Sequence, residues 1–460
     1  MDGTFTLMIA ILMAPLFAAI MSLTDERIAK ASNVSLSSFA AVISTYALAR
    51  GLTLKTGHFY IDFYSSALVA MISWIYLFAS LASLSYTNRI KNPFFPIRVY
   101  WALLGLFAFT MIFTALSRSI GWMWIGLEGT TIVSALLTVT DAKKRTIEGA
   151  WRYIIVASSG LAIAFLSIII VYSVAGTLQV GDFTLSGKAA LLAAVLALVG
   201  FGTKAGLFPM HSWLPDAHGS APSPVSAMLS GTLLPTALLV YMRVYTAAMP
   251  NRTVFRVTLL SGVLTVIMAA IFMASQTYLK RLLAYSSMDV MGVATVGIAL
   301  GYHDTTVMKL VFLLFTVHAF SKGALFISGG SLISALGTRR IDGIRGLFGS
   351  TRFSWLTVSL SALAVTGAPP FGVFIAELFI VARALRDSPG MGAALLIGLL
   401  LSFLALNWHV SGMVFGRKSG DSSGEGAEKR PDIGAGEEVV PFVMVLAALG
   451  LSLWAWGVMV

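Results

Sequence analysis

The chain has 460 residues, of which 57% are hydrophobic and 11% are charged, and it carries a net charge of +11 with no cysteine. Soluble domains average about 25% charged residues, so this composition excludes a water-soluble fold and predicts that lipid is the solvent. The lack of cysteine excludes disulfides and thiolate-bound iron–sulfur or zinc centres in this chain, and the basic residues lie in short loops, where lipid headgroups explain them better than nucleic acid does.

Long apolar runs follow one another from residue 5 to the end of the sequence. A membrane-spanning helix needs about 20 apolar residues. The runs predict about fourteen transmembrane helices, near residues 5–23, 31–49, 64–86, 99–117, 119–139, 152–174, 188–208, 222–246, 255–275, 282–301, 305–329, 353–384, 391–414 and 440–459. The fold class is therefore an all-α integral membrane protein.

Loop charges indicate how these helices cross the membrane. Basic residues cluster in four loops that fourteen helices would place on one face: Arg89, Lys91 and Arg98; Lys143 to Arg145; Lys280 and Arg281; and Arg339, Arg340 and Arg345. The positive-inside rule assigns this face to the cytoplasm, so both termini are predicted outside the cell (inner) membrane. Arg252 and Arg256 oppose that assignment. Residues 415–439, rich in glycine, serine and charge, predict a flexible polar loop.

Four ionisable residues lie well inside apolar runs, namely Glu128, Lys204, Lys322 and Glu377. Each such residue costs about 2.5–3.5 kcal/mol at a helix centre, so its presence predicts an ion or proton path. The alternative is a set of buried ion pairs that only hold helices together.

Two of the predicted helices carry helix-breaking residues. Pro209 and Pro215 follow Lys204, and a second run contains Gly367, Pro369, Pro370 and Gly372 before Glu377. Interrupted helices at matching positions of two halves indicate inverted repeats around an ion site near the membrane midplane. We therefore predict N-terminal helices 1–3 in residues 1–98, a first five-helix repeat (helices 4–8) in 99–246, a second repeat (helices 9–13) in 247–414, a polar loop in 415–439 and the last helix in 440–460, with helices 7 and 12 broken.

Histidines lie near these features. His318 is one turn before Lys322 on the same helix face, whereas His211, Asp216 and His218 follow the first break. Because histidine titrates near neutral pH, His318 is a candidate proton carrier and the other three are accessory candidates. A bland alternative for each histidine is a hydrogen bond to the broken backbone. We predict no metal or cofactor site, because no third histidine or cysteine is close.

Three segments, in this order, resemble one known family. PMHSWLPDAHGSAPSPVSAMLSG (209–231), LKRLLAYSSMDVMG (279–292) and HAFSKGALFISGGS (318–331) are similar to motifs of the antiporter-like membrane subunits. That family occurs in respiratory complex I, membrane-bound nickel–iron hydrogenases and Mrp-type cation/proton antiporters. The resemblance implies that Glu128, Lys204, Lys322 and Glu377 form a chain of charges that carries protons, or exchanges them for sodium, with nickel–iron or iron–sulfur centres in partner subunits.

One position departs from the family pattern. Many relatives carry a lysine in helix 8, where this chain has Pro235 within LSGTLLPTALLVYMR (229–243). An unbroken lysine relay is therefore in doubt, and water, or His318 with Lys322, would have to join the halves. Pro235 and Asp289, which follows the YSS segment, favour the hydrogenase-associated branch.

Three functions follow as alternatives. The first is the proton- or sodium/proton-translocating subunit of a membrane-bound redox complex, which is not catalytic alone and is bound to other membrane subunits, redox subunits and lipid. The second is a subunit of an Mrp-type cation/proton antiporter, or a stand-alone transporter of the same kind. The third is a non-conducting membrane scaffold.

Overall fold

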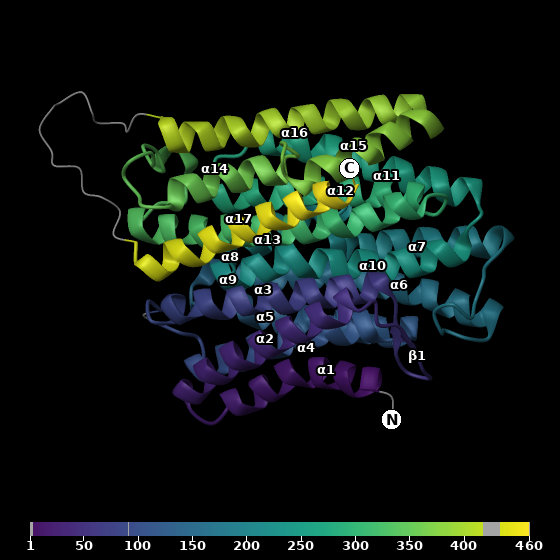
Figure 1. The fold of residues 1–460 in the computed structure, drawn as a ribbon, viewed down its shortest axis with the longest axis horizontal. Helices are drawn as coiled ribbons and strands as arrows, with labels where there is room; N and C mark the ends of the chain where they lie inside the picture. Colours follow the sequence, from purple (N-terminus) through teal and green to yellow (C-terminus); the bar gives the residue numbers. More distant parts are fainter. Residues whose placement is uncertain (1–2, 91, 417–432, 460) are drawn as a thin grey trace, which may run out of the picture.

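The computed structural model describes residues 3–90, 92–416 and 433–459, which form a bundle of long helices (Figure 1). The helices are α1 (Gly3–Ser22), α2 (Glu26–Ala49), α3 (Phe63–Thr87), α4 (Ile97–Leu116), α5 (Ile120–Thr138), α6 (Lys144–Ala175), α7 (Gly187–Ala205), α8 (Trp213–Ser220), α9 (Ser223–Met228), α10 (Leu234–Ala248), α11 (Arg252–Ala274), α12 (Leu279–Gly301), α13 (Thr305–Leu336), α14 (Ser354–Val365), α15 (Gly372–Asp387), α16 (Pro389–Phe415) and α17 (Ala435–Met459). Strands β1 (Leu54–Lys55) and β2 (Tyr60–Ile61) pair as a small antiparallel hairpin.

The predicted all-helical membrane fold is confirmed. Twelve segments of the described chain are long and apolar enough to cross a membrane, judged by length and composition. The two remaining predicted spans are α2, which is rich in serine, and the pair α14 and α15, which divides the predicted helix 353–384. The helix predicted from residue 152 begins earlier, at Lys144, and the one predicted to end at residue 329 continues to Leu336.

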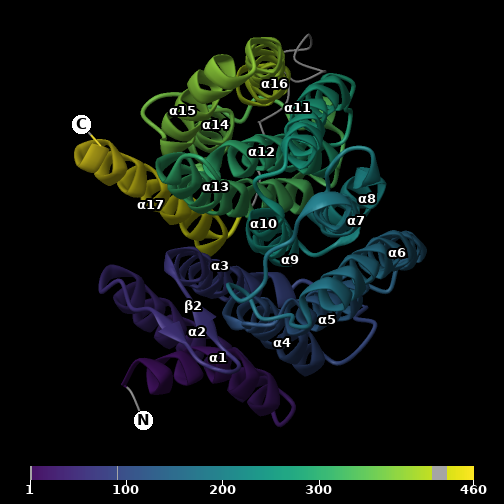
Figure 2. The ribbon, with the colours of Figure 1, turned by 90° about the vertical axis from the view of Figure 1, so that its right-hand side faces the viewer.

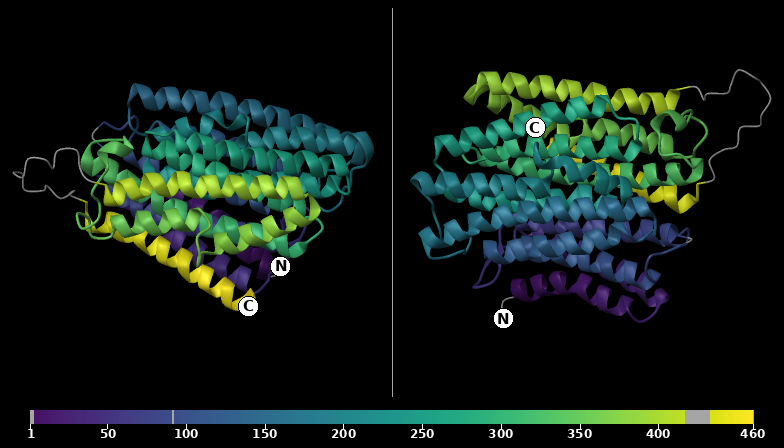
Figure 3. Two further views of the ribbon diagram at one scale, coloured as in Figure 1. Left: turned by 90° about the horizontal axis from the view of Figure 1, so that it is seen from above. Right: turned by 180° about the vertical axis from the view of Figure 1, so that it is seen from behind.

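The ends of the helices separate into two faces. α1 begins and α17 ends at the same end of the bundle, whereas α16 ends and α17 begins at the opposite end (Figures 1 and 3). The basic loops meet at that opposite end, where Pro93 pairs with Asp141 and Tyr278 pairs with Arg340 through backbone bridges. We call this end the basic face. Most of the predicted polar loop, residues 417–432, lies outside the described residues.

Helices α9, α10, α12 and α13 form the centre of the bundle. Seen along the helices, α10 lies between the N-terminal helices and the group α11–α16 (Figure 2). The most apolar 18-residue stretch of the span Ser223–Ala248 is wholly buried, and 94% and 89% of the residues are buried in the corresponding stretches of α12 and α13. Residues at these positions therefore face protein on every side, so polar groups among them must find partners inside the bundle.

Small residues let helices approach closely around this centre. The backbone of Gly262 in α11 packs on that of Gly292 in α12, and Gly200 in α7 packs on Ala164 in α6. A side chain added at Gly262, Gly292 or Gly200 would collide with the neighbouring helix. In lipid the hydrophobic effect does not drive helices together, so van der Waals contacts at such small residues hold them to one another.

Helical structure is interrupted at two places, after α7 and after α14. α7 ends at Ala205, where Gly206 adopts φ +76°, and a 3-10 turn (Met210–Ser212) leads into α8. The Trp213 indole donates to the Thr203 carbonyl at 2.7 Å. α14 ends at Val365, and the Pro370 carbonyl before α15 accepts from the Trp456 indole at 2.9 Å. Side chains thus satisfy backbone groups that the breaks release. The relation of the two halves as inverted repeats stays a prediction.

An ion pair fastens α3 to α10 at the face opposite the basic loops. Arg243, which is 6% exposed, donates to both carboxylate oxygens of Asp62 at 2.6 and 2.8 Å and to the Ser65 hydroxyl at 3.0 Å. Burial alone would raise the pKa of Asp62, but the hydrogen bonds and charge of Arg243 outweigh it and hold that pKa below 3.8. The pair therefore contributes stability above the pKa of the unfolded chain, and the contribution is lost as the pH falls through the lowered pKa.

We expect Arg243→Ala to lower the free energy of unfolding by about 3 kcal/mol at neutral pH, because it leaves a buried carboxylate without its partner. The difference from wild type should shrink in acid, where Asp62 is protonated in both proteins. Denaturant unfolding in detergent at neutral and acidic pH measures both effects. Lys55→Ala is the control, since its pair with Asp182 is exposed and should matter little. An equal loss of unfolding free energy in Arg243→Ala and Lys55→Ala would contradict a stabilising role of the buried Arg243–Asp62 pair.

Candidate functional site

Lys204 lies at the end of α7, directly before the first break, and is fully buried. Its ammonium donates to the Thr131 hydroxyl and to the Tyr153 hydroxyl, both at 2.7 Å. Tyr153 in turn shares a 2.8 Å hydrogen bond with Ser134. The lysine is therefore held by hydroxyl groups from α5 and α6, which can both accept and pass on a proton.

Glu128 lies one turn before Thr131 on the same face of α5. The Ser158 hydroxyl donates to one carboxylate oxygen at 2.8 Å, and the other oxygen is buried without a hydrogen-bond partner among the described residues. The charge of Glu128 acts on both Lys204 and Tyr153. The Glu128 carboxylate and the Lys204 ammonium thus interact electrostatically, and each has its own hydroxyl partners.

Lys322 has an equivalent setting in the second half of the chain. It is fully buried on α13 and donates to the Leu283 carbonyl at 2.7 Å and to the Ser286 hydroxyl, both on α12. Asp289 lies one turn beyond Ser286 and is 2% exposed. It accepts a 2.7 Å hydrogen bond from Ser402 of α16, and its charge acts on Lys322.

Glu377, on α15, adds a second acidic side chain to this group. It is 7% exposed, and the charge of Asp289 acts on its carboxyl group. Asp289 on α12 is therefore close enough to act electrostatically on both Lys322 of α13 and Glu377 of α15. One of the Glu377 oxygens is buried without a hydrogen-bond partner among the described residues, which leaves it available to a water molecule or an ion.

The second break shapes the position of Glu377. Gly367 adopts φ +66°, which other residues rarely adopt, and a Cβ atom added there would collide with the Glu377 carboxylate. We expect Gly367→Ala to destabilise the protein by about 1–3 kcal/mol and to displace Glu377. Gly450→Ala is the control, because its Cβ would meet nothing within 4 Å. Thermal unfolding in detergent measures both variants, and a Gly367→Ala protein as stable as the control would contradict this packing.

The four accessory candidates and His318 lie in different surroundings. His318 is buried beside Lys322, whose charge acts on it, and His218 is buried against the Phe326 ring at 4.8 Å and also within the field of Lys322. Asp289 joins the Lys322 group described above. His211 is half-buried between the rings of Phe208 and Phe272, and Asp216 pairs with Arg152 and Arg281 at the basic face. The structure therefore brings His318, His218 and Asp289 to Lys322, and it leaves His211 and Asp216 apart.

Pro235 is the second residue of α10, which follows a π-helical stretch, Leu229–Leu233, that comes directly after α9. A proline in a helix lacks an N–H group and crowds the carbonyl four residues before it, here that of Gly231. The wider π-helical turn accommodates this change. In that stretch Ser230 shares a 2.7 Å hydrogen bond with Ser287 of α12. Hydroxyl groups thus lie close to the place where the resemblance would put a lysine.

Comparison with known proteins decides the family. Residues 117–404 match the family described as NADH:quinone oxidoreductase/Mrp antiporter, transmembrane part. The chain belongs to this family. Residues 117–404 include all five proposed pathway residues and both breaks.

Relatives of the chain include subunits of several membrane complexes. The hydrogenase-4 component F homolog of Methylacidiphilum infernorum is 31% identical over 343 residues, which cover 71% of this chain and 72% of that protein. The NADH-quinone oxidoreductase subunit N of Pelobacter propionicus is 27% identical over 286 residues, 61% of each chain. A subunit of the Mrp complex from Dietzia sp. superposes with a TM-score of 0.87 at 18% identity and covers 100% of this chain and 96% of its own. This Mrp subunit thus shares the fold along the whole chain.

Several groups of the site could not be found from the sequence pattern. Thr131, Tyr153, Ser286 and Ser402 contact the charged residues, and Ser134 contacts Tyr153. Hydroxyl residues are common in membrane helices, however, and carry no spacing signal. Ser158 contacts Glu128, and Ser230 bonds to Ser287 between the two halves. The Thr203 hydroxyl bonds to its own helix, at the Val199 carbonyl.

Proposed function

We propose that this chain is the proton-translocating subunit of a membrane-bound redox complex. The observation that carries the proposal is the series of ionisable groups inside the helical bundle: half-buried Glu128 with buried Lys204, and buried Lys322 with Asp289 and Glu377. All but Glu377 lie on helices long enough to span a membrane. Each such group costs about 2.5–3.5 kcal/mol in lipid, and a proton path is the usual reason for keeping it.

The proposed path has two parts. In the first, Glu128 and Lys204 exchange a proton through the Thr131 and Tyr153 hydroxyls. In the second, Lys322, Asp289 and Glu377 pass it from α13 to α15. His318, with water and the Ser230–Ser287 pair, bridges the two parts in place of the lysine that Pro235 replaces. The same carboxylates would serve sodium in a sodium/proton exchange.

Glu128→Gln tests the first part. The amide keeps the size of the side chain and a hydrogen bond to Ser158 but cannot release a proton. We expect proton transport to fall about tenfold, less than the loss of about a hundredfold or more typical of a positioned acid, because Glu128 is half-buried and water can partly replace it. Glu148→Gln, at the exposed start of α6, should leave transport unchanged. Equal rates in Glu128→Gln and wild type would remove Glu128 from the path.

We also propose the setting of the subunit. Other membrane subunits and redox subunits with nickel–iron or iron–sulfur centres would surround it, and the basic face would lie in the cytoplasm with both termini outside the cell membrane. Hydrogenase-4 in the name of one relative supports a redox complex. Purification in mild detergent followed by mass spectrometry tests this setting. Nickel–iron or iron–sulfur partners would support it, whereas small membrane partners only would indicate an Mrp-type antiporter.

Pro235 favours a second candidate, a scaffold that does not conduct. If the chain only holds neighbouring subunits, Glu128→Gln should change the yield of the complex and not its transport rate per complex. If the chain instead translocates protons, Glu128→Gln should lower the transport rate per complex and leave the yield of the complex unchanged. Quantifying assembled complex by native gel beside the transport assay separates the two.

A further inference from the structure

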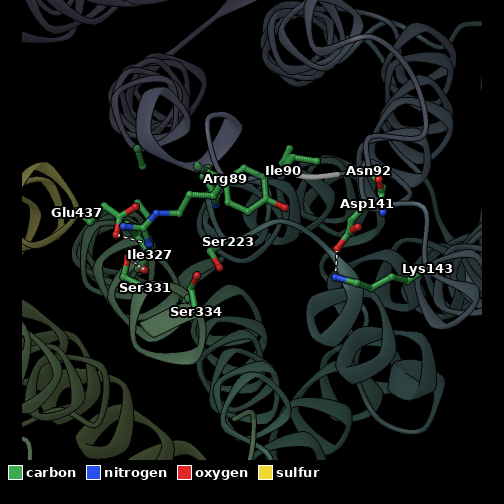
Figure 4. Close-up of a pocket in the computed structure, with 14 residues that line it drawn as sticks. Arg89, Ile90, Asn92, Asp141, Lys143, Ser223, Ile327, Ser331, Ser334 and Glu437 are labelled. Atoms are coloured by element: carbon green, nitrogen blue, oxygen red, sulfur yellow. Dashed lines mark hydrogen bonds and ion pairs between the residues drawn. The ribbon is translucent and has the colours of Figure 1, made fainter. Parts of the chain in front are cut away.

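The basic face contains a cavity that the proposed proton path does not use. One part, of about 380 Å³, lies between the Arg89–Glu437 and Lys143–Asp141 ion pairs, with Ser223 and Ser334 between them (Figure 4). A second part, of about 200 Å³, shares Tyr86, Asp141, Lys143, Ser223, Gly330 and Ser334 with the first. We call the two parts together the basic vestibule.

Charge is unbalanced in the second part. Its walls carry five basic side chains, Lys143, Arg145, Lys280, Arg281 and Arg339, and one acidic side chain, Asp141. The first part differs, because each of its basic residues has a carboxylate partner. An excess of cations around one cavity attracts an anion.

Three of these five cations have a hydrogen-bond or ion-pair partner. Lys143 pairs with Asp141, Arg281 pairs with Asp216 at 3.1 Å, and Lys280 donates to the Ala221 carbonyl at 2.8 Å. Within the described ranges, the side chains of Arg145 and Arg339 make neither a hydrogen bond nor an ion pair. Two guanidinium groups therefore face the vestibule with their donors free.

The two arginines are held in place, although their donors are free. The Arg145 guanidinium lies over the Tyr278 ring at 5.8 Å, and the Arg339 carbonyl accepts a 3.1 Å hydrogen bond from the Leu279 amide. Burial, and after it the charge of Arg145, lower the pKa of Arg339. The two cations thus repel each other across a shared space, and an anion between them would relieve the repulsion.

We propose that the basic vestibule binds a phosphate group between Arg145 and Arg339, carried by an anionic lipid or by a soluble phosphate. Planar guanidinium groups match the oxygens of phosphate in pairs, and Tyr86, Ser223 and Ser334 provide further hydroxyl donors. The vestibule lies at the ends of membrane-spanning helices, where lipid headgroups are expected, and basic pockets between such helices bind anionic headgroups.

The full chain in phosphatidylcholine nanodiscs, with or without phosphatidylglycerol, tests the lipid source. After exchange into phosphatidylcholine, native mass spectrometry should find phosphatidylglycerol retained on wild type. The double variant Arg145→Gln/Arg339→Gln should bind it about 25-fold more weakly, because each basic residue near an anionic surface contributes a factor of about five. Arg252→Gln/Arg256→Gln, two exposed arginines at the start of α11, is the matched control and should retain the lipid like wild type.

Inorganic phosphate tests the soluble source. Thermal unfolding in phosphate and in chloride at equal ionic strength should show stabilisation of wild type by phosphate and none in the double variant. Phosphate stabilisation without lipid retention would assign a soluble phosphate, and both together would assign the headgroup. Arg145→Lys/Arg339→Lys, which keeps the charge without the planar fork, should bind at an intermediate level and shows that folding is intact. Equal retention and equal stabilisation in wild type and the double glutamine variant would overturn the proposal, as would no binding by wild type.

Discussion

Replacing Lys204 with methionine should reduce proton transport by at least about a hundredfold, the usual contribution of a positioned proton-transfer group. The ammonium is the only part of the side chain that contacts Thr131 and Tyr153 through hydrogen bonds. Methionine fills similar space without a titratable group. Transport by the reconstituted complex, measured with a pH-sensitive dye, gives the result.

The stability of this variant separates function from folding. Methionine removes the desolvation cost of a buried ammonium, and the hydroxyls of Thr131 and Tyr153 keep the Leu127 carbonyl and the Ser134 hydroxyl as partners. We therefore expect Lys204→Met to unfold at the same temperature as wild type or higher. Lys188→Met, at the exposed start of the same helix, is the matched control and should transport normally. A Lys204→Met protein that is stable and transports at the control rate would remove this lysine from the path.

Asp289→Asn should have the second largest effect, a loss of transport of about a hundredfold. Asp289 is the group whose charge acts on both Lys322 and Glu377, so its loss interrupts the series in the middle. Asparagine keeps the size and can accept the Ser402 hydrogen bond, so the helices should remain packed. Asp342→Asn, in an exposed surface pair, is the control.

A double-mutant cycle tests whether Asp289 and Lys322 act in one path. If they act in series, the double variant Asp289→Asn/Lys322→Met should transport protons no more slowly than the slower of the two single variants. Multiplied losses would indicate two independent routes. The same dye assay on the four proteins supplies the cycle, with assembled complex quantified for each.

Much of the fold could be predicted from hydrophobic runs, because lipid requires them. The predicted helix at 353–384 marks the limit of this signal. Hydropathy continues across Gly367 to Gly372, so the run appears as one element, and only its glycines and prolines indicate that α14 and α15 are separate. The early start of α6 at Lys144 has a related cause, since helix extends into polar sequence beyond the apolar run.

The charged residues of the site were visible in the sequence, because each interrupts an apolar run. Their partners were not. Thr131 lies 73 positions before Lys204, and Ser402 lies 113 positions after Asp289, so only packing of the helices brings them together. The vestibule at the basic face likewise depends on how separate loops meet. Domain limits and the repeat relation stay predictions.

The most direct test of proton translocation is proton flux into proteoliposomes containing the native complex with Glu128→Gln, Lys204→Ala and Glu377→Gln combined. Turnover of co-purified redox subunits, or an imposed sodium gradient where no redox subunit co-purifies, supplies the driving force. We predict that the complex assembles and that proton flux through this subunit is lost. Wild-type flux in the triple variant would contradict the proposed path.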